Sequence, residues 1–303
     1  MLHLLPASDT LKPGVAEVAK TSGGATLNPN VAEVAKTFGA FRYDSLGDVV
    51  DRLVCQELVN ELAELAWYTN YAEQPIPVAV DISEAQRLSR IAHTSLAPHG
   101  IELVDMHAAV ICEPHFNRVV AQTGSKGELL SRTTLDLVVR LLDTCAGTST
   151  PLPASSATSS TSSCTISSAQ LATNYTAAAE VFCDRQGGRK NYLPNLMAAL
   201  PERWFVETQV SPQRSSYHSS AEPALTVHFS VGGDSFPPTA LASMLAKYLR
   251  ERLVSELNGY WRQFIPDLQA TAGYPVDARR FRNQIEPLAQ REQLPVEQWW
   301  RCK

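Results

Sequence analysis

Two aspartates stand within three residues after runs that predict buried strands. Asp184 follows Ala177–Cys183 (AAAEVFC), and Gly233-Asp234 follows Leu225–Val231 (LTVHFSV). Short apolar runs bounded by turn residues indicate strands. A carboxylate at the exit of a strand is suited to holding a divalent cation, because Mg²⁺ prefers carboxylate oxygens and keeps part of its water shell. The sequence therefore predicts a metal site that uses Asp184 and Asp234.

A predicted helix with a polar face follows the second aspartate. Pro237-Pro238 opens it, since proline is tolerated in the first turn of a helix. Ser243, Lys247 and Arg250 are spaced i, i+4 and i+7, so they share one face of that helix. The core-facing stripe is formed by Leu241, Met244, Leu245, Tyr248 and Leu249. A polar face of this kind, next to a metal site, suits phosphate binding.

Each of these residues also has an ordinary structural explanation. Asp is a favoured N-cap, so Asp234 could simply cap the helix. Lys247 and Arg250 could belong to a solvated helix face. Asp184 precedes Gly187-Gly188 and could serve a polar turn. The spacing alone leaves both interpretations open.

Three segments, in order, resemble type 2 ribonuclease H (ribonuclease HII). Ala242–Glu251 (ASMLAKYLRE) resembles that family's Ala-Ser-Ile-Leu-Ala-Lys-x-x-Arg-Asp signature. In the family a Gly-Asp pair precedes this signature, and its Asp binds metal. Gly233-Asp234 stands at the matching place here. Asp184 matches the Asp that ends an apolar strand in the family and binds metal. Thr271–Asp277 (TAGYPVD) resembles the family turn whose Tyr packs on the sugar at an RNA–DNA junction, which implies that role for Tyr274.

The resemblance implies both a fold and an activity. The fold would be α/β, a ribonuclease H-like mixed sheet flanked by helices and incomplete at the N-terminus. The activity would be Mg²⁺- or Mn²⁺-dependent endonucleolytic cleavage of the RNA strand in RNA–DNA hybrids or in ribonucleotide-containing duplexes. Asp184 and Asp234 would be catalytic metal ligands, and Tyr274 would contact the junction. The residues expected to contact phosphate are Ser243, Lys247, Arg250, Arg189 and Lys190.

Part of the family's metal site has no counterpart in this sequence. The family's first strand begins Asp-Glu-Ala-Gly-Arg-Gly, and no adjacent Asp-Glu occurs here, as if the chain started after that strand. Asn117 stands where the family usually has an acid. Asp81 and Asp105 are possible substitutes. Two-metal hydrolysis needs enough carboxylates to hold two ions, so we expect little or no nuclease activity from this chain. Two alternatives remain: a catalytically dead remnant that binds nucleic acid, and a product without stable function.

The chain divides by composition into a short N-terminal segment and one long domain. Residues 1–44 contain Val-Ala-Glu-Val-Ala-Lys-Thr twice, at Val15–Thr21 and Val31–Thr37. Residues 45–303 form the predicted ribonuclease H-like domain. Within it, the Ser/Thr-rich stretch 147–168 is too poor in apolar residues to order itself, so it predicts a disordered insertion.

Further elements are predicted from periodicity and capping signals. Ser45 to Asp48 resembles a capping box that opens a helix reaching about Trp67. Trp204–Gln209 and Leu225–Val231 are expected to pair as antiparallel strands joined by a polar loop, 210–223. The remaining expectations are a helix at Ser83–Leu96, a strand at Ile101–Cys112, a helix at Glu113–Val120 and a long helix at Leu129–Leu142.

Composition indicates a globular protein without a transmembrane helix, and we expect it to be cytoplasmic and monomeric. The 303 residues are 44% hydrophobic, and no apolar run is long enough for a transmembrane helix. Six scattered cysteines without a CxxC pair indicate free thiols. The net charge is −5, but residues 1–183 hold 11 Lys+Arg against 19 Asp+Glu, whereas residues 184–303 hold 15 against 12. A local basic surface for nucleic acid is therefore expected in the C-terminal part.

Overall fold

The computed structural model describes residues 4–6, 43–76, 81–101, 103–147 and 178–302. They divide into two compact units whose segments alternate along the chain. The sheet unit takes its described residues from Met1–Thr26, Leu103–His107 and Leu130–Ser243. The helical unit takes them from Leu27–Glu102, Ala108–Leu129 and Met244–Lys303. The predicted segments 1–44 and 147–168 lie almost entirely outside the described residues, so the domain boundaries stay predictions.

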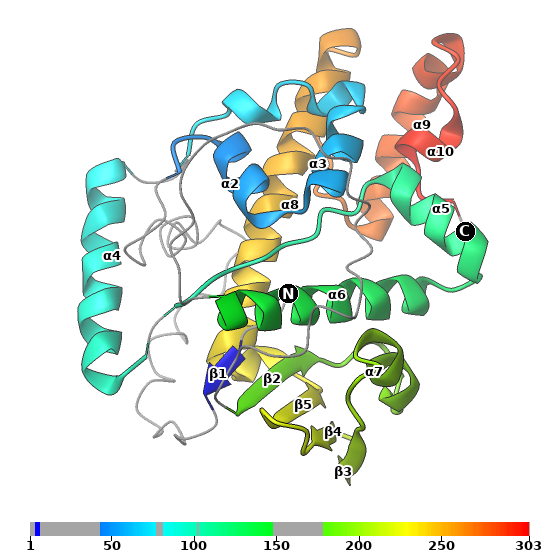
Figure 1. Ribbon diagram of the computed structural model, residues 1–303. Coiled ribbons are helices and arrows are strands. Elements are labelled where there is room, and N and C mark those ends of the chain that lie inside the picture. The colour runs from blue at the N-terminus through cyan, green and yellow to red at the C-terminus, as the bar shows by residue number, and fades with distance from the viewer. Residues whose placement is uncertain (1–3, 7–42, 77–80, 102, 148–177, 303) are drawn as a thin grey trace. The chain divides into compact units, whose positions relative to one another are not determined.

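The sheet unit is built on a mixed sheet, which confirms the predicted α/β class. Its four main strands are β2 (Ala179–Asp184), β3 (Val206–Val210), β4 (Arg214–Ser219) and β5 (Leu225–Ser230). The short β1 (Leu4–Pro6) pairs antiparallel with β2, and the order is β1-β2-β5-β4-β3. Strands β2 and β5 are parallel neighbours, whereas the β5–β4 and β4–β3 pairs are antiparallel (Figure 1).

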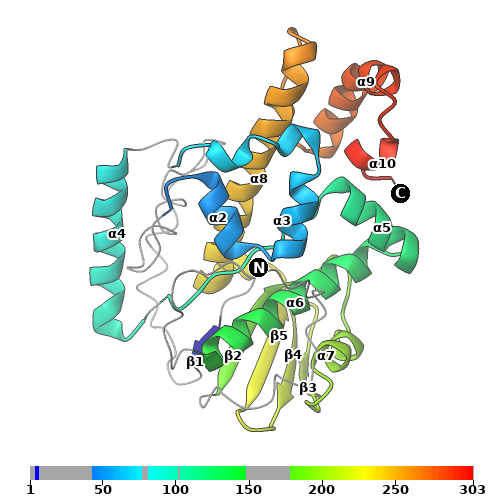
Figure 2. The ribbon, with the colours of Figure 1, turned by 45° about the horizontal axis from the view of Figure 1, so that its top comes forward.

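Strand formation in β2 and β5 follows the alternation of side chains. In β2 the buried residues are Ala179, Val181 and Cys183, and in β5 they are Leu225, Val227 and Phe229. Tyr192 stacks on Phe229 with ring centroids 3.7 Å apart, and Tyr217 meets the same ring edge-on. Helix α6 (Lys126–Gly147) lies along the sheet, with α7 (Leu193–Ala199) beside β3 and β4 (Figures 1 and 2). The core of this unit therefore lies between the sheet and these two helices.

The helical unit packs several helices around aromatic side chains. It contains α2 (Leu46–Leu53), α3 (Gln56–Ala63), α4 (Ile82–Leu96), α5 (Glu113–Thr123), α9 (Pro275–Arg291), α10 (Val296–Trp299) and most of α8 (Pro237–Phe264). Single 3₁₀ turns occur at Ala66–Tyr68, Tyr71–Glu73 and Ala97–His99. The buried indoles of Trp67 and Trp261 stack 6.2 Å apart. Among the described helices, none is long and apolar enough to cross a membrane.

Most of the predicted elements are confirmed. Strands β2 and β5 and helices α4, α5, α6 and α8 lie where the sequence predicts them. The capping box is present: the amide of Asp48 donates to the Ser45 hydroxyl, and the Asp48 carboxylate accepts from the Ser45 amide. Gly124 ends α5 in the left-handed conformation, with φ of 67°. These features are determined locally, so sequence patterns reveal them.

The predicted continuous helix from residue 45 to about Trp67 is wrong. It is divided into α2, α3 and a 3₁₀ turn, because Val54 is extended (φ −105°, ψ 142°) and ends α2. The carbonyl of Leu53 accepts a hydrogen bond of 2.7 Å from the Ala108 amide. A distant segment thus takes up a carbonyl group that a continuous helix would have used internally.

The predicted strand at Ile101–Cys112 is also wrong. Its described residues are irregular, apart from one bridge between Ala108 and Val54. Several of its side chains are nevertheless buried, among them Leu103, Met106 and Cys112. The apolar pattern correctly predicted burial, but burial alone does not provide a partner strand.

The predicted antiparallel pairing of Trp204–Gln209 with Leu225–Val231 is wrong as well. Strand β4 lies between β3 and β5 and pairs with both. It occupies part of 210–223, the stretch expected to be a loop. Its inward positions are Ser215, Tyr217 and Ser219, two of which are small polar residues that gave no apolar alternation.

Candidate metal centre

Asp184 and Asp234 lie at the same end of two neighbouring strands. Asp184 is the last residue of β2 and is paired in register with Ser230, the last residue of β5. Asp234 follows β5 in a 3₁₀ turn, Gly233–Ser235. Because β2 and β5 are parallel, their carboxyl ends meet at one end of the sheet. We call these two residues the acid pair.

A close backbone contact connects the two segments. The Gly233 amide donates a 3.0 Å hydrogen bond to Oδ1 of Asp184. A Cβ atom added to Gly233 would lie 2.9 Å from the Asp184 Cα, which is too close for any side chain. Gly232 begins the turn in the left-handed conformation, with φ of 64°. The Gly-Gly sequence before Asp234 is therefore required for this approach.

The acid pair has oxygen atoms available for a cation. Both residues are exposed, and no described residue hydrogen-bonds to Oδ2 of Asp184 or to the Asp234 carboxylate. Asp234 makes no side-chain capping bond to α8, so the capping explanation receives no support from the described contacts. Two carboxylates fit a hydrated Mg²⁺, which commonly takes one or two protein carboxylates and keeps several waters.

The candidate substitutes for the missing acids serve other purposes. Asp105 is buried in the sheet unit, where Oδ1 accepts from the Met106 amide and Oδ2 lies 3.5 Å from His107 Nε2. Asp81 belongs to the helical unit and accepts from the Ser83 amide and hydroxyl at the start of α4. Over the residues that the structure describes, no three or more His, Cys, Asp or Glu side chains form a metal-binding group.

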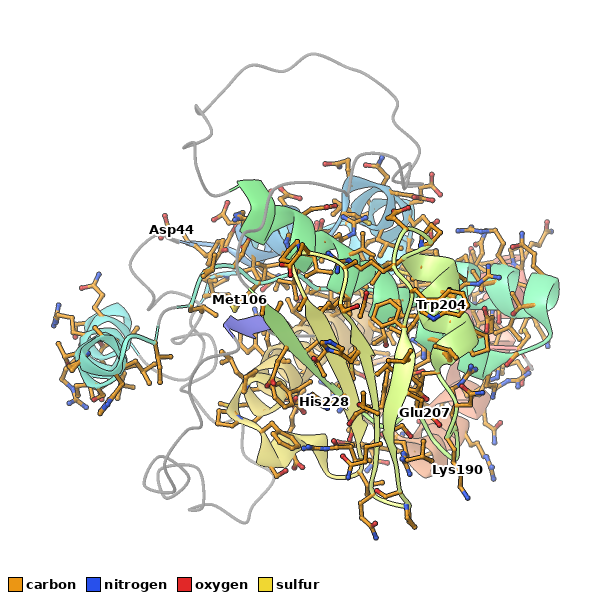
Figure 3. All side chains as sticks on the ribbon, turned by 60° about the horizontal axis from the view of Figure 1, so that its bottom comes forward. Asp44, Met106, Lys190, Trp204, Glu207 and His228 are labelled. Carbon is orange, nitrogen blue, oxygen red and sulfur yellow. The ribbon has the colours of Figure 1, made fainter. Side chains whose placement is uncertain are left out.

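The cations that follow Asp184 differ in their surroundings. Arg189 donates 2.6 Å to Asn195 Oδ1 and lies over the Tyr192 ring, so it helps hold the start of α7. Lys190 is exposed and labelled in Figure 3, and its carbonyl accepts from the Ser215 hydroxyl. Of these two predicted phosphate contacts, Lys190 has the more accessible side chain.

Ser243, Lys247 and Arg250 all lie on the continuous helix α8, but their surroundings differ. Ser243 is exposed and belongs to the sheet unit, whereas Lys247 and Arg250 belong to the helical unit. The exposed Lys247 ammonium lies 4.0 Å from the half-buried carboxylate of Glu251, and such a solvent-accessible pair has small energetic value. Arg250 is half-buried, and its guanidinium lies 4.7 Å from the ring centre of Tyr274. Arg250 and Tyr274 therefore act together as one stacked group.

The turn that presents Tyr274 is held by a dense set of hydrogen bonds. Buried Asn258 donates to the Thr271 carbonyl and accepts from the Thr271 amide, both at 2.8 Å. Asp277 accepts from the Thr271 hydroxyl, the Ala272 amide and Arg280. These bonds favour its ionised form and lower the pKa of Asp277 to about 2. Tyr274, 54% exposed, is thus presented by a rigid segment, residues 271–277, which we call the Tyr274 turn.

Asn117 has a structural role that an acid could not fill. Its side-chain amide donates to the carbonyls of Glu297 and Trp300, and its oxygen accepts 2.7 Å from the Cys302 amide. An ionised carboxylate only accepts hydrogen bonds, so it could not make the first two contacts. Asn117 therefore fastens the C-terminal segment within the helical unit.

Sequence reasoning missed a group of residues on the same sheet face as Asp184. Arg214 opens β4, in the stretch interpreted as a loop, and Phe236 follows Asp234 by two residues. The sequence of β4 (RSSYHS) has serines at inward positions 215 and 219, so no apolar alternation was available to identify this strand. Comparison with known proteins adds no further guide, because no family model, curated protein or solved structure matches this chain.

Proposed function

We propose that this chain is a ribonuclease HII-like protein that acts on nucleic acid at the acid pair. The activity would be divalent-metal-dependent cleavage of the RNA strand in RNA–DNA hybrids or ribonucleotide-containing duplexes, with Mg²⁺ or Mn²⁺. The observation that carries the proposal is the meeting of Asp184 and Gly233-Asp234 at the carboxyl ends of adjacent parallel strands. These are the two acids that the motif resemblance singles out.

The residues of this site have distinct tasks in the proposal. Asp184 and Asp234 would hold the cation, and the Gly233 amide orients the Asp184 carboxylate by occupying Oδ1. Exposed Lys190 is available to bind phosphate oxygens. A divalent cation at such a site supplies charge neutralisation for phosphate and acidifies its bound water. Tyr274, stacked with Arg250, belongs to the helical unit, and its packing on the sugar at an RNA–DNA junction is a separate prediction that the resemblance implies.

A second candidate function is nucleic-acid binding without cleavage. It is favoured by one observation: among the described residues no third carboxylate joins the acid pair in a metal-binding group. Two-metal hydrolysis requires enough carboxylates to hold both ions. Binding depends mainly on cations and stacking groups, so it does not require the complete metal site.

A cleavage assay separates the two functions. The full chain is incubated with an RNA–DNA hybrid and with a duplex carrying one ribonucleotide, in Mg²⁺ and in Mn²⁺. Under the enzyme proposal, Asp184→Asn should lower cleavage at least a hundredfold, whereas Asp136→Asn, an exposed acid on α6, should leave it unchanged. Cleavage equal in wild type and Asp184→Asn would contradict the proposed site. No cleavage by folded wild type, together with binding of the hybrid, would establish the second function.

A further inference from the structure

A row of side chains extends from the acid pair across the sheet face that carries Asp184, with the buried Ser230 in the middle of the row. Asp184 on β2 is opposite Ser230 on β5, and Ser230 is opposite Arg214 on β4. Residues directly opposite one another project from the same face, and neighbouring strands lie about 4.8 Å apart. The backbones of Asp184 and Arg214 are therefore about 10 Å apart on one face. Arg214 Nε donates a 3.1 Å hydrogen bond to the Ser230 hydroxyl, which holds the guanidinium in this row.

Flat side chains are stacked beside this row. The Arg214 guanidinium lies 4.9 Å from the ring centre of Phe236. Phe236 stacks on Phe182 at 4.9 Å and 23°, and Phe182 stacks on His228 at 5.1 Å and 25°. All four side chains are half-buried, so each keeps part of its surface accessible (His228 is labelled in Figure 3). The sheet face next to the acid pair thus combines a cation with partly exposed aromatic rings.

Arg214 supplies a cation on this part of the surface. No described residue accepts a hydrogen bond from its two Nη groups. His228 bonds to the Ser216 hydroxyl through Nδ1, and burial together with nearby Arg214 lowers the pKa of His228 to about 4. His228 is therefore neutral at pH 7. An anion that approaches this face would meet the Arg214 guanidinium, whose planar donor arrangement matches phosphate.

We infer that Arg214, Phe236 and Phe182 form a nucleotide-binding surface continuous with the acid pair. Arg214 binds a phosphodiester neighbouring the one held at the acid pair, and the two rings pack against the sugar or base of the same strand. The inference rests on the proposed function, because it takes the acid pair as the place where a nucleic-acid backbone lies. Aromatic rings on an open sheet face, combined with Arg, are a recurrent means of holding unpaired or exposed nucleotides.

Binding measurements with the full chain test this surface. A labelled RNA–DNA hybrid is titrated in EDTA by fluorescence anisotropy at several salt concentrations, so that no cleavage or metal site is needed. Arg214→Gln should weaken binding. It should also reduce the slope of the logarithm of the binding constant against the logarithm of the salt concentration by the amount of about one phosphate contact. Phe236→Leu should weaken binding about fivefold while leaving the slope unchanged, because stacking involves no phosphate charge. Arg132→Gln, an exposed arginine on α6, serves as the matched control and should bind as wild type.

The outcomes separate this inference from the proposed function. Wild-type binding that persists unchanged in both Arg214→Gln and Phe236→Leu overturns the surface and leaves the acid pair unaffected. Folded wild type that binds no hybrid overturns both proposals. If circular dichroism shows that Arg214→Gln is unfolded, Ser230→Ala and Phe236→Leu carry the test. The surface is supported if both of these variants weaken hybrid binding without changing its salt dependence, and it is overturned if neither variant weakens binding.

Discussion

The acid pair and the Tyr274 turn are held in place by opposite means. At the acid pair, backbone interactions position two exposed aspartates: the parallel pairing of β2 with β5 and the hydrogen bond from the Gly233 amide to Asp184. In the Tyr274 turn, side chains position the backbone, because Asn258 and Asp277 form hydrogen bonds to residues of the segment 271–277. Removing a carboxylate from the first region should therefore leave its fold intact, whereas removing a side chain from the second should dismantle it.

This difference shows which polar groups remain available for a ligand. The oxygens of Asp277 are used within the protein, by Thr271, Ala272 and Arg280. The Asp234 carboxylate has no such partner among the described residues. A polar group that the fold does not use is the better candidate for binding, because a buried or fully bonded one would have to give up existing hydrogen bonds.

The largest effect on stability is expected from Asn258→Ala. This change leaves the buried amide and carbonyl of Thr271 without partners, at a cost of about 2–4 kcal/mol in the free energy of unfolding. Urea denaturation measures it. Asn283→Ala, at an exposed position of α9, should cost less than about 0.5 kcal/mol. Equal losses in the two variants would show that the Tyr274 turn does not depend on Asn258.

A smaller effect is expected at the acid pair, and only from a change that obstructs the backbone. Gly233→Ala places a Cβ 2.9 Å from the Asp184 Cα, which should cost about 1–3 kcal/mol. Gly188→Ala is the matched control, because nothing lies within 4 Å of its added Cβ. Asp184→Asn, which keeps the backbone, should destabilise less than Gly233→Ala. Thermal denaturation that ranks Asp184→Asn as the more damaging change would refute the comparison.

The smallest effect is a local, pH-dependent opening of the Tyr274 turn. The pKa of Asp277 is lowered to about 2 in the folded protein, so its ionised form stabilises the turn above about pH 4. That contribution is lost as the pH falls from about 4 to about 2. Hydrogen exchange of the Ala272 amide should lose protection over this range, about tenfold, and Asp277→Asn should remove the pH dependence. An amide whose protection is the same in wild type and variant would exclude this role.

Local patterns predicted the elements that carry the acid pair but not their neighbours. The apolar runs before Asp184 and Gly233 identified β2 and β5 because those strands bury one face. Strand β4 was missed because serines 215 and 219 occupy its inward positions, and small polar residues carry no periodic hydrophobic signal. The proposed nucleotide-binding surface could not be predicted either, since Arg214 belongs to that strand.

Two structural features depend on hydrogen bonds to residues far away in the sequence, which local sequence patterns do not predict. The helix expected from residue 45 ends at Val54 because Leu53 bonds to Ala108, more than fifty residues away in the chain. Asn117 was noted only as a departure from a motif, whereas the structure shows it fastening the C-terminal segment. Both are non-local hydrogen bonds, which sequence periodicity does not encode.

The sequence by itself determined that two aspartates follow strands and that a Gly-Gly turn precedes the second. It determined this because hydrophobic alternation and glycine act on the chain locally. Only the tertiary structure decided that β2 and β5 are neighbours and parallel, which brings Gly233 to Asp184 across 49 residues of sequence. Strand pairing is a choice among distant partners, and the energy that decides it comes from packing of the whole sheet against its helices.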